Sequence, residues 1–299
     1  MGLSVGVVGT SVGLAVRGLL DGASAPPAAT KRIPAIAVAG DRDAAGDASY
    51  VGLEAAFPGT GTSIGHGRIA TWSKFDVLSG DYRWRFITLD SGKKSMGSRW
   101  NEQLAWIPEA VSGTYAGIIV LVHEPAVSLG GKDRGSAATQ ELLEKIDVSA
   151  PMDSVKAVLT AGPAVSQALL PEGILGALHL GAGGGGAPAS DLHRRATTSE
   201  GAPLVLAKGF DAALQKGLRG WSGETPVSSR NYERATSSGA FKGTAGVYDS
   251  GEYPTYGWWR GEIDGATLKF TWRRWQQDGT FKDTWSIAFT RQTGWKEMP

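Results

Sequence analysis

The sequence contains no cysteine and only four histidines, so residues that often hold metals or act as nucleophiles are scarce. The absence of cysteine excludes disulfides, thiolate catalysis, zinc–thiolate sites and iron–sulfur clusters. An excess of charge of either sign is also lacking, because 30 basic residues face 29 acidic ones. This balance removes any general attraction to nucleic acid or to an anionic membrane surface.

Long apolar runs are lacking too, and none approaches the roughly 20 residues that a membrane-spanning helix needs. The first 20 residues are apolar, but glycines and Arg17 interrupt them, and no charged segment precedes them as in a signal peptide. We expect a buried strand over residues 3–8, then a glycine turn and a short helix. The sequence does not specify the cellular compartment, and an extracytoplasmic location would follow if a signal segment had been removed.

Short apolar runs rich in valine and isoleucine are present instead, and glycine-containing loops separate them. Runs of this kind indicate strands that are buried on both faces. They lie at residues 33–39, 84–89, 116–122, 155–159 and 174–180. Helical patterns occur between several of them, at residues 98–112 and 137–146. Strands that alternate with helices predict an α/β layered core.

The composition and periodicity of the sequence change near Thr197. Residues 219–256 are rich in Ser, Gly, Thr and Tyr and have little periodicity, which favours a long covering loop. The alternating segments that follow are separated by Asp264-Gly265 and Asp278-Gly279, a pattern typical of antiparallel hairpins. We therefore expect a core over 1–196, a loop-rich excursion over 197–256 and C-terminal hairpins over 257–299.

Five blocks of sequence follow one another in a characteristic order. They are Ile36–Asp43, Trp84–Asp90 with Gln103-Leu-Ala-Trp106, Ile118–Pro125, Gly181–Pro188, and Tyr256–Asp283. In this order they resemble the calcineurin-like metallophosphoesterases, and in particular the purple acid phosphatase type. The resemblance implies an α/β fold of two packed mixed β-sheets flanked by helices, with the C-terminal hairpins joining one sheet. It also implies that Gly40 and His123 lie at the same edge of the core.

The chemistry of that family uses two metal ions held by Asp, Asn and His side chains at strand ends, where a metal-bound hydroxide attacks phosphorus. Several of the implied positions carry other residues in this sequence. Thr10 stands where the resemblance places the bridging carboxylate, and Pro163 and Val165 stand where it places two histidines. We therefore expect a degenerate metal site.

Four residues remain at the implied site. Asp41 and Arg42 stand at the positions of a ligand asparagine and a catalytic histidine, followed by Asp43 and, later, His123. Arg42 and His123 are thus vestigial catalytic candidates, and Asp41, Asp43 and His123 are candidate ligands. We expect no cofactor, or at most one divalent metal ion. In the simpler alternatives, His123 is a hydrogen-bonded residue at the strand rim and residues 41–43 form a surface turn. His179 and His193 match no metal spacing and are expected in solvent or loops.

Tryptophan is concentrated towards the C-terminal end, where Arg residues accompany it. Along a strand, Trp258 and Trp259 point to opposite faces, and so do Trp272 and Trp275. An exposed tryptophan beside arginine is typical of protein interfaces. The candidate partner-binding residues are Trp258, Trp259, Arg260, Trp272, Arg273 and Trp275. The alternatives are that these rings stack on sugars or that they pack beneath residues 219–256.

These observations favour a catalytically inactive protein of metallophosphoesterase-like fold that serves as a structural or protein-binding subunit. Other protein subunits would contact it through loops at residues 44–80 and 197–256. One alternative is a divergent metal-dependent phosphoesterase with a reduced metal site, and a weaker one is a glycan-binding module. Neither nucleic acid nor a membrane is an expected partner.

Overall fold

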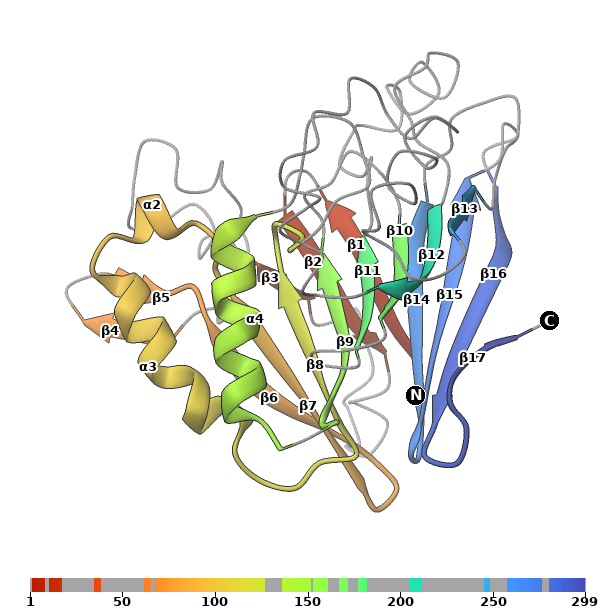
Figure 1. The fold of residues 1–299 in the computed structure, drawn as a ribbon, viewed down its shortest axis with the longest axis horizontal. Helices are drawn as coiled ribbons and strands as arrows, with labels where there is room; N and C mark the ends of the chain where they lie inside the picture. The colour runs from red at the N-terminus through yellow and green to blue at the C-terminus, as the bar shows by residue number, and fades with distance from the viewer. Residues whose placement is uncertain are drawn as a thin grey trace, which may run out of the picture.

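The computed structural model describes residues 2–8, 11–17, 35–38, 62–65, 68–126, 136–151, 153–160, 167–171, 177–181, 205–210, 245–247, 257–275 and 280–298. In these residues the chain forms three layers, with helices outside, an eight-stranded sheet in the middle and a seven-stranded sheet behind it (Figure 1). The expected α/β class, with two packed sheets and flanking helices, is confirmed. Only the eight-stranded sheet is mixed, because every strand pair of the seven-stranded sheet is antiparallel.

The eight-stranded sheet has a parallel centre formed by β7 (Tyr82–Leu89), β8 (Gly117–Val122) and β9 (Val155–Thr160). All six residues of β8 are buried, as expected for a valine- and isoleucine-rich strand covered on both faces. β6 (Ser73–Ser79) forms one edge and pairs antiparallel with β7. The strands beyond β9 are β11 (Leu178–Gly181), β10 (Gln167–Pro171), β12 (Val205–Phe210) and β13 (Ala245–Val247).

Two helices, α3 (Arg99–Val111) and α4 (Ala137–Ser149), cover one face of this sheet. Their apolar side chains, including Ile107 and Ile146, share a core with the sheet residues that face the helices, such as Val120. α4 begins at a serine cap, because the Ser136 hydroxyl accepts the backbone N–H of Thr139 at 3.3 Å. The remaining short elements are α2 (Lys93–Met96) and a separate hairpin of β4 (Thr62–Gly65) and β5 (Arg68–Ala70). No helix in the described ranges has the length and apolar character to cross a membrane.

The seven-stranded sheet combines strands from both ends of the sequence. β1 (Gly2–Val8) pairs antiparallel with β14 (Gly257–Asp264), so that the first strand lies beside strands more than 250 residues later. The C-terminal hairpins therefore join one sheet, as expected. The other strands are β2 (Ser11–Arg17), β3 (Ala35–Val38), β15 (Thr267–Trp275), β16 (Phe281–Thr290) and β17 (Gly294–Met298).

The helix expected after the first glycine turn is wrong. Residues 11–17 form β2, which pairs antiparallel with β1 along its whole length. Val12, Leu14 and Val16 alternate with small residues, a period of two that fits a strand. Glycine and β-branched valine also have lower helix propensity than alanine or leucine, so local preference agrees with the strand.

Five further strands lie within stretches expected as loops. β4, β5 and β6 fall within residues 44–80, and β12 and β13 fall within 197–256 and extend the eight-stranded sheet. The first hairpin turn is also displaced by one residue from the expected Asp-Gly pair. Asp264 pairs with Thr267, so Gly265 and Ala266 form the turn, and the φ of +55° at Gly265 is one that glycine accepts readily. The turn expected at residues 278–279 and the rest of residues 219–256 lie outside the described residues, and the three-segment division stays a prediction.

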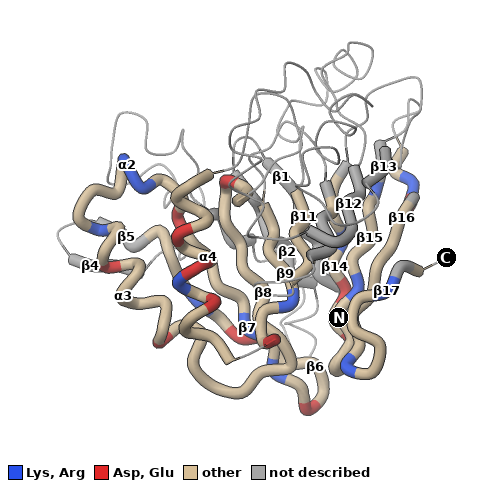
Figure 2. Tube along the Cα trace, viewed as in Figure 1, with Lys and Arg blue, Asp and Glu red and all other residues tan. Residues whose placement is uncertain are grey.

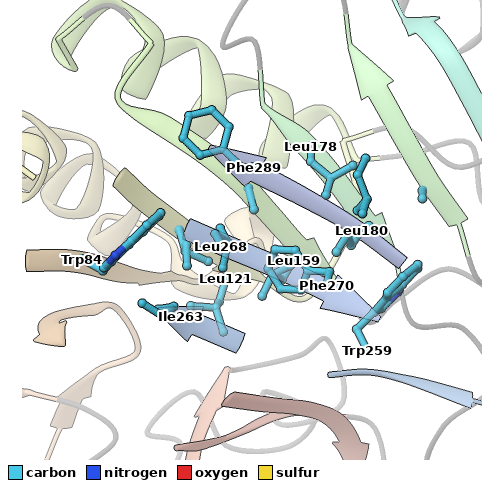
Figure 3. Packing of buried hydrophobic residues seen from close by; sticks show 14 of the residues in the cluster. Trp84, Leu121, Leu159, Leu178, Leu180, Trp259, Ile263, Leu268, Phe270 and Phe289 are labelled. Atoms are coloured by element: carbon cyan, nitrogen blue, oxygen red, sulfur yellow. The ribbon is translucent and has the colours of Figure 1, made fainter. Parts of the chain in front are cut away.

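The main core lies between the two sheets (Figure 3). Along β7, Trp84 and Phe86 point into this core, whereas Ile87 and Leu89 point towards the helices. Fully burying a large apolar side chain contributes about 1.5–3 kcal/mol to the free energy of unfolding. The core residues labelled from the two sheets are Trp84, Leu121, Leu159, Leu178, Leu180, Trp259, Ile263, Leu268, Phe270 and Phe289.

Candidate functional site

The carboxyl ends of the three central parallel strands lie together along one side of the eight-stranded sheet, which is called the strand-end edge below. Leu89 is in register with Val122, and Val122 is in register with Thr160. The residues that follow β7 and β8 are Asp90 and His123, which therefore emerge at neighbouring positions. In open α/β sheets, ligands bind outside this edge. Gly40, expected at the same edge, lies outside the described residues.

Asp90 is buried at this edge, with 1% of its surface exposed. Its carboxylate accepts hydrogen bonds from the Thr71 hydroxyl and from the backbone N–H of Gly92, the latter at 2.8 Å. The Gln103 side chain of α3 accepts the Asp90 backbone N–H at 2.8 Å and donates to the Asp90 carbonyl at 2.9 Å. The amide of Gln103 thus pairs with the backbone as a neighbouring strand would. Asp90 holds the turn after β7 against α3.

His123 follows β8 and is 7% exposed, in agreement with a position at the rim of the buried strand. The chain around it is tied to its neighbours on both sides. The backbone N–H of Glu124 donates to the Ser91 hydroxyl at 3.3 Å, and the Thr139 hydroxyl of α4 donates to the Glu124 carbonyl at 2.9 Å. These bonds fix His123 between the end of β7 and the first turn of α4.

The other residues of the implied catalytic and metal site cannot be placed beside His123. Asp41, Arg42 and Asp43 lie outside the described residues, as do the substituted positions 10, 163 and 165. Within the described residues no three His, Asp or Glu side chains gather as a metal ion would require. The Asp90 carboxylate accepts two hydrogen bonds, which give it a structural role in the turn after β7. A single ion at Asp41, Asp43 and His123 stays a prediction.

His179 differs from its expected loop position, because it lies within β11 and is 7% exposed. Leu178 and Leu180 point into the core between the sheets, so alternation directs His179 to the other face of its sheet. Burial lowers the pKa of His179 to about 4, which keeps the imidazole neutral near pH 7. His193 lies outside the described residues.

Two tryptophans of the expected partner-binding set are core residues. Trp259 and Trp272 are 1% and 0% exposed, and their ring centroids lie 5.0 Å apart. The Trp259 indole N–H also donates to the Gly181 carbonyl of β11 at 3.0 Å. The expectation that these two rings contact a partner is therefore wrong, because alternation turns both towards the other sheet. The side chain of Trp275 lies outside what the structure describes.

Trp258, Arg260 and Arg273 lie on the opposite, outer face of the seven-stranded sheet. The Arg273 Nε lies 2.7 Å from Asp283 Oδ1, and Arg260 Nη2 lies 3.1 Å from Asp283 Oδ2. The Arg273 guanidinium is 5.3 Å from the centre of the Trp258 ring, and the Phe281 ring meets Trp258 edge-on at 6.4 Å. These five residues are called the outer-face cluster below.

Sequence reasoning missed Asp283 and Phe281. Both reach the outer face because β15 and β16 shift register between Trp272 and Arg273, so that Arg273 pairs with Asp283. A β-bulge of this kind leaves no distinct signal in a single sequence. Figure 2 shows charges of both signs along β14–β17.

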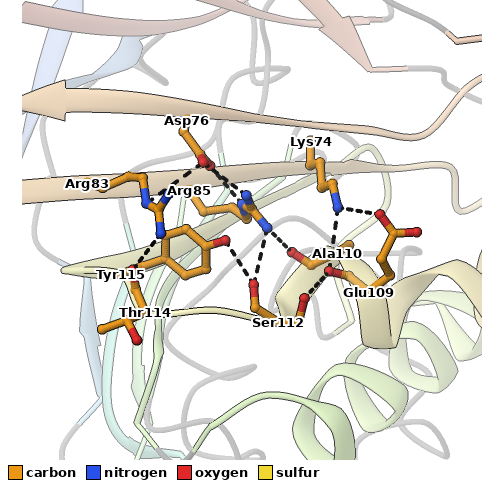
Figure 4. Close-up of polar contacts among 9 residues, drawn as sticks. All are labelled: Lys74, Asp76, Arg83, Arg85, Glu109, Ala110, Ser112, Thr114 and Tyr115. Atoms are coloured by element: carbon orange, nitrogen blue, oxygen red, sulfur yellow. Dashed lines mark hydrogen bonds and ion pairs between the residues drawn. The ribbon is translucent and has the colours of Figure 1, made fainter.

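A second polar cluster joins β6 and β7 to the end of α3 (Figure 4). The guanidinium of Arg85 forms a two-pronged pair with Asp76 at 2.7 and 2.9 Å and donates to the Ala110 carbonyl at 2.8 Å. The hydrogen bond and charge of Asp76 raise the pKa of Arg85 against the opposing effect of burial. The contact with Ala110 satisfies a carbonyl in the last turn of α3, where positive charge is favoured. This cluster anchors the helix.

No family model matches the chain, and no curated protein matches it. A solved structure described as "Structure of PhoD" is similar, with a TM-score of 0.44 and 12% identity over 79% of this chain and 45% of that one. A second, "GAP50 the anchor in the inner membrane complex of Plasmodium", has a TM-score of 0.36 and 13% identity over 72% and 54%. The chain thus spans about half the length of each. Similarity at this level assigns no activity, metal or partner to this chain.

Proposed function

We propose that this chain is a structural or protein-binding subunit that does not hydrolyse phosphate esters, and that the outer-face cluster is its contact surface. The observation that carries the proposal is that half-buried Trp258 and exposed Phe281 lie beside arginines that are already fixed in place. None of the described helices lies over this face, because α3 and α4 pack on the other sheet.

The composition of the cluster matches the residues that dominate protein interfaces. Tryptophan and arginine are enriched among interface residues whose truncation costs most binding energy. Phe281 is 40% exposed, and the Arg260 and Arg273 side chains are 29% and 30% exposed. Their shared ion pair with Asp283 restricts both arginines before binding. Less side-chain entropy is then lost when a partner docks.

The absence of catalysis is proposed from the sequence and from Asp90. Thr10, Pro163 and Val165 occupy positions that the family resemblance assigns to ligands. The Asp90 carboxylate, at the strand-end edge, has a structural role, since the Thr71 hydroxyl and the Gly92 N–H donate to it. Both observations support a scaffold that positions surfaces rather than reacting groups.

The test is isolation of the tagged chain from the cells that produce it, followed by native mass spectrometry. We expect a second polypeptide in a fixed molar ratio. The double variant Trp258→Ala and Phe281→Ala should weaken that complex by about tenfold or more. Val148→Ala trims an apolar side chain that is 79% exposed on α4, away from this face, and should leave the complex intact. A monomer in every preparation, or equal loss with Val148→Ala, would contradict the proposal.

A second candidate function is metal-dependent phosphoester hydrolysis with a reduced site. It is favoured by the burial of His123 at the strand-end edge next to Ser91 and Asp90, where ligands bind in related sheet architectures. The test is hydrolysis of aryl phosphate monoesters and diesters with added manganese, iron or zinc. Turnover of about 10 per second that is abolished by Asp41→Ala or His123→Ala would establish this function. Background rates unchanged by either substitution would support the scaffold.

A further inference from the structure

A lysine lies between the two sheets at the end opposite the strand-end edge, where β9 begins and the turn between β16 and β17 lies nearby (Figure 1). We propose that Lys156 is a covalent modification site, whose amine takes up an acyl group from an acyl phosphate while Arg291 holds the phosphate. This inference depends neither on the outer-face cluster nor on a metal ion at the strand-end edge.

A β-bulge at the start of β9 gives Lys156 its position. Ile118 of β8 is in register with Val155, but the next residue, Ile119, is in register with Ala157, so Lys156 is the extra residue of the bulge. Val155 packs on the helix side of the sheet, whereas Ala157 faces the core between the sheets. Bulges re-aim a side chain in this way and are frequent beside functional sites.

The side chain of Lys156 crosses β8 and reaches the other sheet. A Cβ atom on Gly117 would lie 2.5 Å from the Lys156 Cγ and 2.6 Å from the Trp84 ring, so glycine leaves the space that this path needs. The Lys156 Nζ lies 4.5 Å from the centre of the Phe289 ring of β16 and donates to the backbone carbonyl of Asp153. The amine is thus held at a defined place beside an aromatic ring.

These surroundings favour the neutral form of the amine. Burial is the main cause that lowers the pKa of Lys156, the negative charge of Asp153 opposes it, and the positive charge of Arg291 lowers the pKa further. A lysine attacks carbonyl carbon only as the free amine, and desolvation and a neighbouring cation are two established ways to activate it. Lys156 therefore has more nucleophilic amine near neutral pH than an exposed lysine has.

Arg291 indicates which class of acyl donor fits. It is exposed in the turn after β16, and its guanidinium lies 5.9 Å from the centre of the Tyr82 ring. Among the residues that the structure describes, no carboxylate forms an ion pair with it. A guanidinium binds phosphate through paired N–H donors. An acyl phosphate offers such a group beside its reactive carbonyl, whereas an uncharged acyl ester does not.

The proposed step is an acyl transfer that needs no metal and no oxidant. The lone pair of the Lys156 Nζ attacks the carbonyl carbon of the acyl phosphate, and a C–N bond forms. The bond between that carbon and the phosphate oxygen breaks, phosphate leaves with the electron pair, and the nitrogen releases a proton to water. The product is an uncharged amide, so the cation–π contact with Phe289 is lost.

The test is to incubate the full chain with acetyl phosphate near neutral pH and to follow acetylation of each lysine by peptide mass spectrometry. We expect Lys156 to react about threefold faster than Lys94, an exposed lysine of α2, or faster still. Arg291→Gln should slow the reaction of Lys156 with acetyl phosphate by about fivefold. The same variant should slow its reaction with the uncharged N-hydroxysuccinimide ester of acetic acid by less than about twofold.

The matched control is Arg83→Gln, because Arg83 is also exposed and lies 4.8 Å from the centre of a tyrosine ring, that of Tyr115. This variant should leave the labelling of Lys156 unchanged, and both variants should unfold at the temperature of the wild type. Reaction of Lys156 no faster than that of Lys94 with either reagent would overturn the proposal. Equal slowing of both reagents by Arg291→Gln would show that Arg291 does not hold the phosphate.

Discussion

The indole nitrogen of Trp84 lies 2.9 Å from the carbonyl oxygen of Gly265 and donates a hydrogen bond to it. Trp84 belongs to the eight-stranded sheet, and Gly265 lies in the turn between β14 and β15 of the other sheet. Trp259 forms the reciprocal bond, because it belongs to the seven-stranded sheet and donates to Gly181 of β11. Each sheet therefore contributes a buried tryptophan that hydrogen-bonds to the backbone of the other.

Replacing Trp84 by phenylalanine tests the first of these bonds. The substitution keeps an aromatic ring but leaves the Gly265 carbonyl without its donor. We expect the free energy of unfolding to fall by about 1–2 kcal/mol more than for Trp272→Phe, measured by urea denaturation. Trp272 is the matched control, since it is equally buried but its indole N–H has no hydrogen-bond partner among the described residues. Equal losses for both variants would show that the bond to Gly265 contributes nothing.

Arg85→Lys should loosen the end of α3. Lysine cannot form both bonds to Asp76 while also donating to Ala110, so we expect a loss of about 1–3 kcal/mol in stability. Amide hydrogen exchange should accelerate most in the last turn of α3. Arg83→Lys is the control, because the Arg83 side chain is 48% exposed and its nearest Asp76 contact is 4.0 Å. Uniform acceleration across the whole chain would contradict a local anchoring role.

Asp90→Asn tests whether the buried carboxylate is structural. Asparagine puts an NH2 group in place of one carboxylate oxygen, so the Thr71 hydroxyl has to turn and accept instead of donate, and the bond from the Gly92 N–H loses its charged acceptor. We expect the free energy of unfolding to fall by about 1–3 kcal/mol. Asp81→Asn, at an exposed position of the β6–β7 turn, should change it by less than about 0.5 kcal/mol. A stable Asp90→Asn protein that loses a measurable phosphoesterase activity would instead assign Asp90 to chemistry.

Burial of His179 makes stability depend on pH. The pKa of this imidazole is lowered to about 4 in the folded chain, compared with about 6.5 in an unfolded one. Below pH 6.5 the unfolded chain therefore takes up a proton that the folded chain does not accept until about pH 4. The contribution is complete above pH 6.5, and on the order of 3 kcal/mol is lost as the pH falls through this window.

The measurement is the free energy of unfolding of the wild type and of His179→Leu between pH 4 and pH 7. The difference between the two proteins should change steeply over this range, with the wild type losing more stability as the pH falls. Parallel curves would show that His179 carries no such dependence. A substitution that fails to fold can be replaced by His179→Gln, which is also uncharged throughout the window.

The parallel centre of the fold was predictable from sequence because its strands are continuous apolar runs. β8 lies within the expected residues 116–122, and α3 and α4 begin within one residue of their expected starts. β6 was missed because Leu78, 61% exposed, breaks the alternation that Phe75 and Val77 would otherwise give. β2 was misassigned because the sequence does not show which strands pair with it. In the structure β1 and β3 lie on either side of it.

The candidate site was less predictable, because its contacts join residues that are far apart in sequence. Thr71 and Asp90 are 19 residues apart, and nothing local marks them as partners. Alternation showed that Trp258 and Trp259 face opposite ways, but not which of them faces the core. That choice depends on the second sheet, which covers Trp259 and leaves Trp258 outside.

The pairing of β1 with β14 has a consequence for synthesis of the protein. Val5 pairs with Trp259, a separation of 254 residues along the chain. A ribosome adds about 5–20 residues per second, so β1 waits roughly 10–50 s before its partner strand exists. During that interval the hairpin of β1 and β2 has one side unpaired, and an unpaired strand edge is a site where chains associate wrongly. A nascent chain halted before residue 257 should therefore be more prone to aggregation, or to capture by a chaperone, than the finished protein.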